Sequence, residues 1–329
     1  MLLEIRHLTQ YHYAEPVRAS VMELWTQPQK NPRQRLISFQ LEVEPTAQLF
    51  SYVDAFGNAV YHFGVPQPHD RLAIESRAAV ETEPPPPLPD RLDMGEWDRL
   101  RSQFVQGEFF DFLRPHGFAA PTPLLAEFVA RHDLDRLRQA DPLTAVRTLN
   151  ETLYQAFDYE SGLTEADSPI DEALTHGRGV CQDFAHIMLT VCRSWGLPAR
   201  YVSGYLFTDR AQDQDRSSPD ATHAWVEVYL PSLHWVGLDP TNNVMAGERH
   251  VMVAVGRDYD DVPPSRGVFQ GDTESELMVA VSVRRARAAA AEPEFMPMSR
   301  PSLNANASRR RTMSLLQEQA LHQQQQQQQ

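Results

Sequence analysis

The first 83 residues alternate hydrophobic and polar positions with the two-residue period of β-strands. Five segments follow this pattern and are rich in aromatic and β-branched residues, at 2–13, 37–43, 50–54, 59–64 and 72–81. Residues 54–58 join two of these segments and contain Asp, Gly and Asn, which tolerate the backbone angles of a tight turn, so they predict a hairpin. We therefore expect residues 1–83 to form a β-sandwich-like domain.

A proline run separates this pattern from the next one. Residues 84–89 read Pro-Pro-Pro-Pro-Leu-Pro, a stiff extended linker that offers almost no N–H donors to a sheet. Helical periodicity follows at 97–105, 108–113, 122–132 and 142–157. Asp141 followed by Pro142 is a strong start signal for the last of these helices. We expect residues 90–283 to form a second, α+β domain.

The C-terminal segment differs from both domains. Residues 284–329 lose hydrophobic periodicity, gain Ala, Ser and Arg, and end in seven glutamines. Such a composition cannot bury enough apolar surface to offset the entropy of ordering, so we expect a disordered tail. The tail holds seven Arg and three Glu (+4), which leaves −18 for residues 1–283.

Composition narrows the classes of function. The chain of 329 residues has a net charge of −14, which disfavours nucleic acid as a partner. It contains only two cysteines, which excludes a disulfide framework and a cysteine-built zinc site. No window approaches the roughly 20 apolar residues of a membrane span. The start of the chain is strand-like, with no basic and then apolar leader, so we expect a cytoplasmic protein without membrane contact.

The clearest chemical signal lies in residues 177–186 and the helix that they begin. Apolar residues recur with helical spacing, which predicts an amphipathic helix, at 181, 184, 185, 188, 189, 192 and 195. Gly196 is placed to end the helix, and Pro198 prevents its continuation. Cys181 then lies in the first turn, where unpaired N–H groups and the positive end of the helix dipole favour a thiolate. The capping residue is left open between Val180 and a neighbouring glycine.

A second segment supplies a base and a carboxylate. His223 begins an alternating strand, a turn containing Pro231 follows, and the returning strand ends at Asp239. If the hairpin closes symmetrically on Pro231, His223 and Asp239 are directly cross-strand, with Cβ atoms about 4.5–5.5 Å apart. The carboxylate can then orient the imidazole while the other ring nitrogen faces Cys181, which is a nucleophile, base and orienter arrangement.

Other residues of these segments have simpler interpretations. Cys192 lies 11 residues after Cys181, about 16 Å along an unbroken helix, so it is expected to pack in the core and to form no disulfide. His186 is expected to be a hydrogen-bonded core residue. The aromatic residues of the hairpin are either cleft walls or core, namely Trp225, Tyr229 and Trp235.

These segments together resemble the bacterial transglutaminase-like superfamily, whose core is papain-like. The resemblance rests on Gly-Val-Cys-Gln-Asp-Phe-Ala-His at 179–186, Gly-Leu-Pro-Ala-Arg-Tyr-Val-Ser-Gly-Tyr at 196–205, His-Ala-Trp at 223–225 and Asp-Pro-Thr at 239–241. Residues 11–17 and 54–58 look like the β domain that precedes the core in one bacterial branch, and residues 253–267 look like its closing segment. The resemblance covers residues 2–283. It implies a helix bearing the Cys packed on an antiparallel sheet bearing the His and Asp.

The resemblance implies a catalytic triad of Cys181, His223 and Asp239. The expected reaction is acyl transfer at an amide through a thioester, most consistent with a cysteine peptidase or amidase acting on a peptide or protein. A protein-glutamine transglutaminase, with a primary amine as acceptor, uses the same triad. A non-catalytic peptide-binding or assembly module is the alternative from another class, although such a module would be expected to lack a triad residue.

Less defined expectations concern the cleft. The Cys181 backbone N–H is expected to be one oxyanion donor. Tyr159, upstream of the nucleophile, is a candidate for the second donor or else packs after its helix; Gln182 and Trp225 are further cleft candidates. The polar run 209–220 leads into His223 and is either a lid or selectivity loop or a solvated loop. We expect no cofactor and no metal, since neither His-Glu-x-x-His nor Cys-x-x-Cys occurs. The sequence does not define the oligomeric state.

Overall fold

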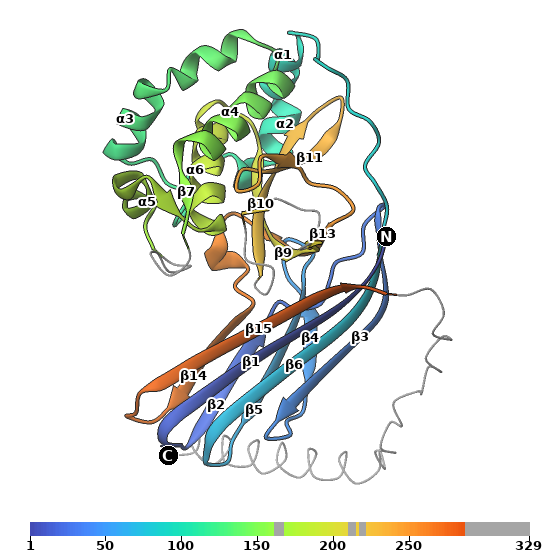
Figure 1. Cartoon of the computed structure of the whole chain (residues 1–329), viewed down its shortest axis with the longest axis vertical. Helices are drawn as coiled ribbons and strands as arrows, with labels where there is room; N and C mark the ends of the chain where they lie inside the picture. Colours follow the sequence, from blue (N-terminus) through green and yellow to red (C-terminus); the bar gives the residue numbers. More distant parts are fainter. Residues whose placement is uncertain (161–167, 210–214, 217–221, 287–329) are drawn as a thin grey trace, which may run out of the picture. The chain divides into compact units, whose positions relative to one another are not determined.

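The computed structural model describes residues 1–160, 168–209, 215–216 and 222–286 (Figure 1). This part of the chain contains two four-stranded antiparallel sheets, a five-stranded antiparallel sheet and a short parallel pair of strands, with helices around the five-stranded sheet. The α+β class expected from the sequence is confirmed. None of the helices in these residues is long and apolar enough to cross a membrane.

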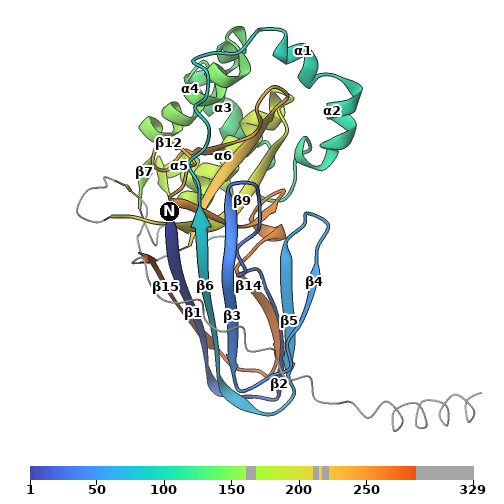
Figure 2. The same cartoon turned by 90° about the vertical axis from the view of Figure 1, so that its right-hand side faces the viewer.

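The first four-stranded sheet has the order β15-β1-β6-β3. Its strands are β1 (Leu2–Val17), β3 (Gln34–Glu44), β6 (His69–Thr82) and β15 (Ser275–Arg285). Figure 2 shows β1, β6 and β3 side by side. Along most of β1 buried and less buried residues alternate, which places one face of the sheet against the core, as the two-residue period predicted.

The second four-stranded sheet has the order β14-β2-β5-β4. Its strands are β2 (Ala19–Leu24), β4 (Phe50–Val53), β5 (Ala59–Val65) and β14 (Ser265–Gln270). Side chains from both sheets form one buried cluster of Tyr13, Val17, Met22, Leu24, Phe63, Val65, Leu72 and Ile74. The two sheets therefore pack as a sandwich around this cluster.

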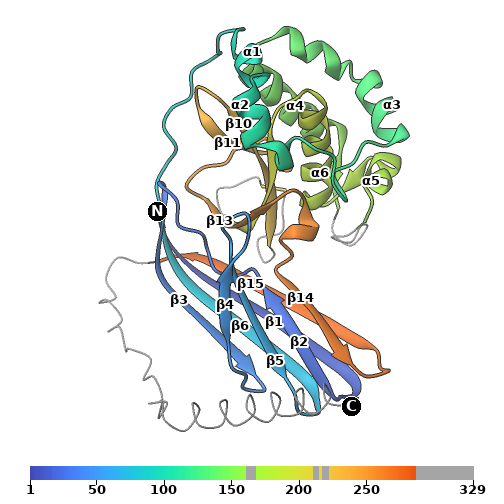
Figure 3. The same cartoon turned by 180° about the vertical axis from the view of Figure 1, so that it is seen from behind.

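The last two strands belong to the sandwich and not to the second domain. We expected residues 90–283 to form that domain, but β15 pairs with β1 from Leu3↔Arg285 to Tyr13↔Ser275, and β14 pairs with β2. Figure 3 shows β14 beside β2. The sequence of residues 265–285 carries no information about which sheet they join, because pairing partners are set by tertiary structure.

The predicted hairpin at 54–58 is present between β4 and β5. Oδ1 of Asp54 accepts the backbone N–H groups of Phe56 and Asn58, each at 2.9 Å, which forms an Asx-type turn. Gly57 has φ +84°, a left-handed conformation that favours glycine. The turn residues seen in the sequence thus perform the roles that their chemistry predicts.

In chain order, the first five α-helices lie between β6 of the sandwich and β9 (Ala199–Leu206) of the five-stranded sheet. They are α1 (Glu96–Leu100), α2 (Gln103–Glu108), α3 (Pro123–Arg131), α4 (Pro142–Ala156) and α5 (Ile170–His176), with short 3-10 turns at Phe110–Phe112 and Leu134–Gln139. The Asp141 side chain caps α4 and accepts the N–H groups of Leu143 and Thr144 at 3.2 Å, as expected for an N-cap residue.

The five-stranded sheet has the order β12-β11-β10-β9-β13. Its strands are β9 (Ala199–Leu206), β10 (His223–Leu230), β11 (His234–Asp239), β12 (Val244–Met245) and β13 (His250–Gly256). Helix α6 (Cys181–Ser194) packs against β9 and β10 and is buried on nearly all sides, more fully than a one-faced amphipathic helix (Figure 1).

The end of α6 is fixed as the sequence predicted. Gly196 has φ +80°, its N–H donates to the Arg193 carbonyl, and the N–H of Leu197 donates to the Cys192 carbonyl. This is a Schellman ending, in which a glycine lets the chain leave the helix while the last carbonyls stay hydrogen-bonded. It directs the chain straight into β9, so the helix and the sheet that it covers are joined by a short rigid turn.

Candidate active site

Cys181 is the first residue of helix α6, and the structure shows which residue caps the helix. Val180 is the N-cap, in an extended conformation with φ −110° and ψ 176°. Its N–H donates to Oδ2 of Asp183 at 2.8 Å. A carboxylate in the first turn also faces the positive end of the helix dipole. The helix therefore begins where a side chain from within it holds the approaching backbone.

The approach to Cys181 requires its two glycines. Gly177 ends α5 with φ +66°. A Cβ on Gly179 would lie 2.5 Å from Oδ2 of Asp183, so only glycine leaves room for the carboxylate. The short strand β8 (Arg178–Gly179) pairs in parallel with β7 (Asp158–Tyr159), which places Tyr159 opposite Gly179. Tyr159 thus lies beside the segment that carries the nucleophile candidate.

The Cys181 side chain is enclosed and lies among polar groups. The residue is 4% exposed, and its Sγ lies 3.2 Å from Oε1 of Gln182. The first turn of a helix leaves backbone N–H groups without intrahelical acceptors, and Cys181 occupies that turn. Gln182 is half-buried beside it. The sulfur therefore has a hydrogen-bond acceptor next to it and the helix N-terminus beneath it.

The hairpin that carries His223 and Asp239 closes one residue later than expected. The pairing runs from Leu230↔His234 to Val226↔Leu238, so the prediction of a turn centred on Pro231 with His223 directly opposite Asp239 is wrong. A three-residue loop followed by His234 at φ +59° produces this register. Because position 234 is a histidine and not a glycine, its left-handed conformation and the resulting shift were not predictable from the residue type.

The two side chains meet in spite of the shift. In the observed register, Asp239 lies two residues from the position directly opposite His223 on the neighbouring strand. An even number of residues keeps its side chain on the same face of the sheet as His223. Nε2 of His223 lies 2.8 Å from Oδ2 of Asp239. Both residues are buried, with His223 3% and Asp239 0% exposed. Parity of the strands, which is unaffected by a shift of two residues, is what brings them together.

The other nitrogen of His223 is available for chemistry. Nδ1 is buried and has no hydrogen-bond partner among the described residues. Burial lowers the pKa of His223, but the Asp239 carboxylate and the nearby Cys181 raise it, to about 10. The side chains of Cys181, His223 and Asp239 therefore lie in one electrostatically linked group, with an imidazole that favours its charged form.

Asp239 is held ionised by many donors. Its Oδ1 accepts the backbone N–H groups of Thr241 (3.0 Å) and Asn242 (3.2 Å), and its Oδ2 also accepts from Nδ2 of Asn242 at 2.8 Å. Burial raises the pKa of Asp239, but His223 and His250 lower it well below its usual range. The carboxylate is thus fixed in place as an anion that can stabilise a protonated His223.

His250 is a site residue that the sequence did not reveal. It begins β13, and its Nε2 lies 3.1 Å from Oδ2 of Asp239. The residue is 7% exposed. No motif in the sequence joined it to the triad, because it comes from a different strand 11 residues beyond Asp239. Asn242 was missed for a similar reason, since it belongs to the loop after β11.

Trp225 lies in the core of this group. The residue is 2% exposed, stacks on the His223 ring at 6.1 Å, and meets the His250 ring edge-on at 5.2 Å. It also lines a cavity of about 380 Å³ together with His250, Gln34 and Met252. Of the two interpretations left open for this tryptophan, its burial favours a core position that still borders a cavity.

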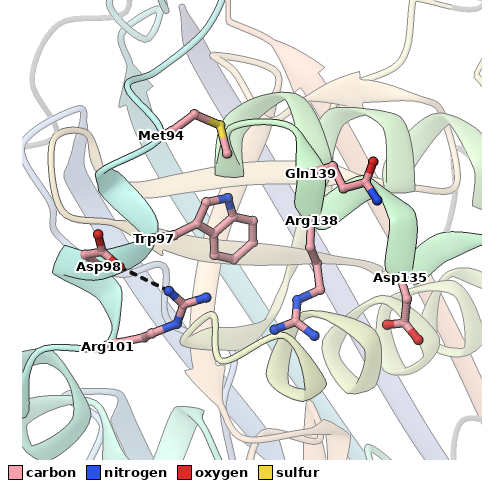
Figure 4. Close-up of a pocket in the computed structure, with 7 residues that line it drawn as sticks. All are labelled: Met94, Trp97, Asp98, Arg101, Asp135, Arg138 and Gln139. Atoms are coloured by element: carbon pink, nitrogen blue, oxygen red, sulfur yellow. Dashed lines mark hydrogen bonds and ion pairs between the residues drawn. The ribbon is translucent and has the colours of Figure 1, made fainter.

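A second cavity of similar volume lies elsewhere. It measures about 380 Å³, contains no triad residue, and is lined by Met94, Trp97, Asp98, Arg101, Asp135, Arg138 and Gln139 (Figure 4). Figure 4 shows Trp97 between Met94 and Arg138, and Arg101 paired with Asp98. Its charged residues are exposed and include no cysteine, serine or histidine, so it offers no chemistry comparable to that of the triad.

The remaining cysteine and histidine have the packing roles expected of them. Cys192 is fully buried, and burial raises its pKa to about 12; both cysteines are free. His186 is fully buried, its Nε2 accepts the N–H of Tyr259 at 3.2 Å, and it stacks between Phe118 and Tyr201. Burial lowers the pKa of His186 to about 3, so its ring is neutral.

Two groups of side chains have the spacing of metal ligands. His223, Asp239 and His250 place one ligand atom each within 4.8 Å of one another, as do His116, Asp258 and Asp261. In the first group both histidine nitrogens that face Asp239 already bond to it, and in the second Asp261 is paired with Arg257. These hydrogen bonds account for both arrangements without an ion.

Comparisons with known proteins show the family of the chain. Residues 3–81 match the bacterial transglutaminase-like N-terminal region, and residues 134–240 match the transglutaminase-like superfamily. Protein ML0607 of Mycobacterium leprae is 34% identical over 283 residues, which cover 86% of this chain and 98% of that protein. Protein Rv2569c of Mycobacterium tuberculosis is 35% identical over 293 residues, covering 85% and 91%. The chain therefore belongs to the transglutaminase-like superfamily.

Two further similarities concern activity and fold. A Pseudomonas aeruginosa protein-glutamine gamma-glutamyltransferase is 33% identical over 124 residues, which cover 35% of this chain and 18% of that enzyme. The crystal structure of a proposed cysteine protease from Cytophaga hutchinsonii superposes with a TM-score of 0.64 at 20% identity, and covers 88% of this chain and 92% of its own. The second similarity supports the fold of the whole described chain, both domains included.

Proposed function

We propose that this protein is a cysteine peptidase or amidase that uses Cys181, His223 and Asp239. The observation that carries the proposal is the His223 ring, which bonds Asp239 through Nε2 and keeps Nδ1 free of other partners while Cys181 lies close enough to raise its pKa. This is the relation that a general base needs toward a nucleophile.

The reaction proceeds in two halves. Before attack, Nδ1 of His223 already holds the proton of the Cys181 thiol, which leaves a thiolate beside a charged imidazole. The sulfur then forms a bond to the amide carbon, and the carbonyl π electrons move to the oxygen. The C–N bond then breaks, and His223 gives its proton to the departing amine, which leaves a thioester on Cys181. In the second half water loses a proton to His223 and attacks the thioester, and the C–S bond breaks to release the carboxylic acid and restore Cys181.

Charge develops on the carbonyl oxygen in both halves. The Cys181 N–H at the start of α6 is the first donor for this oxyanion, because the helix N-terminus presents its amide and its dipole there. Tyr159, opposite Gly179 in the β7–β8 pair, is the candidate for the second donor. Loss of one such donor lowers the rate by about 10²–10³-fold.

Transglutaminase activity is the second candidate, and the likeness to the Pseudomonas glutamyltransferase favours it. The first half-reaction is the same, and a primary amine replaces water in the second. The charge of −18 on residues 1–283 suits neutral or basic peptides in either reaction. We place the enzyme in the cytoplasm, acting without a nucleic acid, membrane, metal or cofactor.

One experiment separates these reactions. A peptide library containing glutamine is incubated with the protein, with and without a primary amine, and the products are identified by mass spectrometry. Cleavage or deamidation in both samples supports the peptidase or amidase, whereas a mass gain equal to the amine less ammonia supports the transferase. Equal product formation by Cys181→Ala would contradict both.

A further inference from the structure

The protonation of His250 is fixed from both sides of its ring. The N–H of Gly247 lies 3.2 Å from Nδ1, so this nitrogen accepts and carries no proton. Burial lowers the pKa of His250 although Asp239 raises it, so the ring is neutral. Its one proton therefore lies on Nε2 and is donated to Oδ2 of Asp239 across 3.1 Å.

We propose that His250 is a positioning residue for the triad, which holds the Asp239 carboxylate in the orientation that His223 requires. The proposal rests on the proposed function of that triad. Oδ2 receives His223, His250 and Asn242, so removal of His250 leaves the carboxylate free to turn toward its remaining donors. A neutral donor fits this role because a lysine or arginine would cancel the charge that stabilises protonated His223.

Trp225 links the two imidazoles. Its indole stacks on His223 with 28° between the planes and meets His250 edge-on at 75°. A Cβ on Gly204 would lie 2.6 Å from this indole, so the backbone of β9 closes the space around it. The positions of the two rings are therefore coupled through one rigid side chain as well as through Asp239.

The sandwich domain holds the strand that carries His250. Strand β13 is an edge of its sheet, and edge strands expose unpaired backbone groups. The Gln34 side chain pairs with both backbone groups of Met252: its Nε2 donates to the carbonyl at 2.7 Å and its Oε1 accepts the N–H at 2.8 Å. Asn58 pairs with both backbone groups of Val255 in the same way, at 2.8 Å each.

Two amide side chains thus replace a neighbouring strand along β13. Gln34 acts two residues from His250 and is 5% exposed, so its hydrogen bonds are protected from water. We infer that the N-terminal domain contributes to catalysis by fixing the start of β13, and through it His250 and Asp239. This assigns the domain a role that does not require it to contact substrate.

Three substitutions of His250 test the donor. His250→Gln keeps an N–H near the position of Nε2, His250→Asn keeps an amide that ends too short to reach Oδ2, and His250→Leu removes the donor at similar volume. The first readout is the rate of Cys181 alkylation by iodoacetamide as a function of pH, followed by mass spectrometry of the Cys181 peptide. This readout needs no substrate. The second is kcat and KM for a cleaved peptide.

We expect His250→Leu and His250→Asn to lower kcat on the order of tenfold with little change in KM, and to alter the pH profile of alkylation. His250→Gln should stay within about threefold of the wild type. His7→Leu is the matched control, because His7 is also buried and also bonds a residue of the five-stranded sheet, Tyr205, at 2.9 Å. It should lower the stability and leave both readouts unchanged.

The outcomes separate this proposal from the proposed function. If wild-type Cys181 reacts no faster than a free thiol and no peptide is turned over, the proposed function fails. If the wild type is reactive and His250→Leu and His250→Asn match it in both readouts, or if His250→Gln is as impaired as they are, the role of His250 is overturned. For the sandwich domain, Gln34→Leu should lower kcat, as the His250 substitutions do. A folded Gln34→Leu variant with wild-type kcat would contradict the role of this domain in holding β13.

Discussion

A Cβ on Gly179 would lie 2.5 Å from Oδ2 of Asp183, the oxygen that accepts the N–H of Val180. We predict that Gly179→Ala displaces this carboxylate and removes the hydrogen bond that starts α6. The free energy of unfolding should fall by about 1–3 kcal/mol, as for the loss of a helix cap with added steric strain. Urea unfolding measures it.

Gly107→Ala is the control for that change. Gly107 lies within α2, and a Cβ there would meet nothing within 4 Å. Alanine in an open helical position is expected to stabilise by up to about 1 kcal/mol. Equal effects of the two substitutions would show that the contact between Gly179 and Asp183 has no energetic role.

Asp239→Asn tests the orienting carboxylate. The substitution keeps the size of the side chain but removes the charge that supports protonated His223, so turnover should fall on the order of 10³–10⁴-fold. His223 has a pKa raised to about 10, chiefly because Asp239 outweighs the effect of burial. The alkaline limb of the rate profile should therefore move toward lower pH in the variant. An alkaline limb that does not move would remove Asp239 from the triad.

Stability should fall toward acid through two buried histidines. Burial lowers the pKa of His7 to about 4 and that of His186 to about 3, from 6.5. A depressed folded pKa contributes stability that is present above 6.5 and lost as the pH falls toward the folded value. Each group costs up to about 1.4 kcal/mol per pH unit in that window.

Urea unfolding between pH 6.5 and about 4 measures this loss. His7→Leu should be less stable near neutral pH and show a shallower decline, because one of the two groups no longer binds a proton on unfolding. A free energy of unfolding that stays constant across the window in the wild type would contradict the assignment of neutral, buried imidazoles.

Arg216, which belongs to the polar run that leads into His223, is held by contacts of its side chain and backbone. Its guanidinium donates to the carbonyls of Tyr154 and Phe157 at 2.9 Å and lies 3.6 Å over the Tyr154 ring. Its backbone N–H donates to Oδ1 of Asn242, which in turn bonds Asp239. The sequence left open either a lid or selectivity loop or a solvated loop at 209–220, and residues 210–214 and 217–220 of it lie outside the described residues.

We predict that Arg216→Ala accelerates proteolytic cleavage within residues 209–222 on the order of tenfold, since charge-assisted hydrogen bonds to two carbonyls are lost. Limited proteolysis followed by mass spectrometry measures the rate. Arg101→Ala is the control, because Arg101 is an exposed arginine that pairs with Asp98. Cleavage equally fast in both variants would argue against an anchoring role.

The sequence predicted the triad because each member leaves a local pattern. Cys181 stands at the start of a periodic apolar segment bounded by glycines, and strand parity alone placed His223 and Asp239 on one face. Parity survived the error in the hairpin register, since a shift of two residues leaves every side chain on its face. The site was thus predictable even where the turn was not.

The residues that the sequence did not reveal act over long range. His250 reaches Asp239 from another strand, and Gln34 and Asn58 support β13 from a separate domain. Likewise, strands β14 and β15 pair with β2 and β1, which lie more than 200 residues away in the chain. Such pairings depend on tertiary structure, which local periodicity does not encode.

The central claim is that Cys181 forms a thioester with substrate. The most direct test is to mix the protein with a cleaved peptide, quench with acid at short times, and analyse the cysteine-containing peptides by mass spectrometry. We predict an acyl group on Cys181 that hydroxylamine removes, and none on Cys192, because burial raises the pKa of Cys192 to about 12. In the wild type, this acyl group should be hydrolysed and should not accumulate. Turnover that continues in Cys181→Ala, with no acyl group on Cys181 in the wild type, would contradict it.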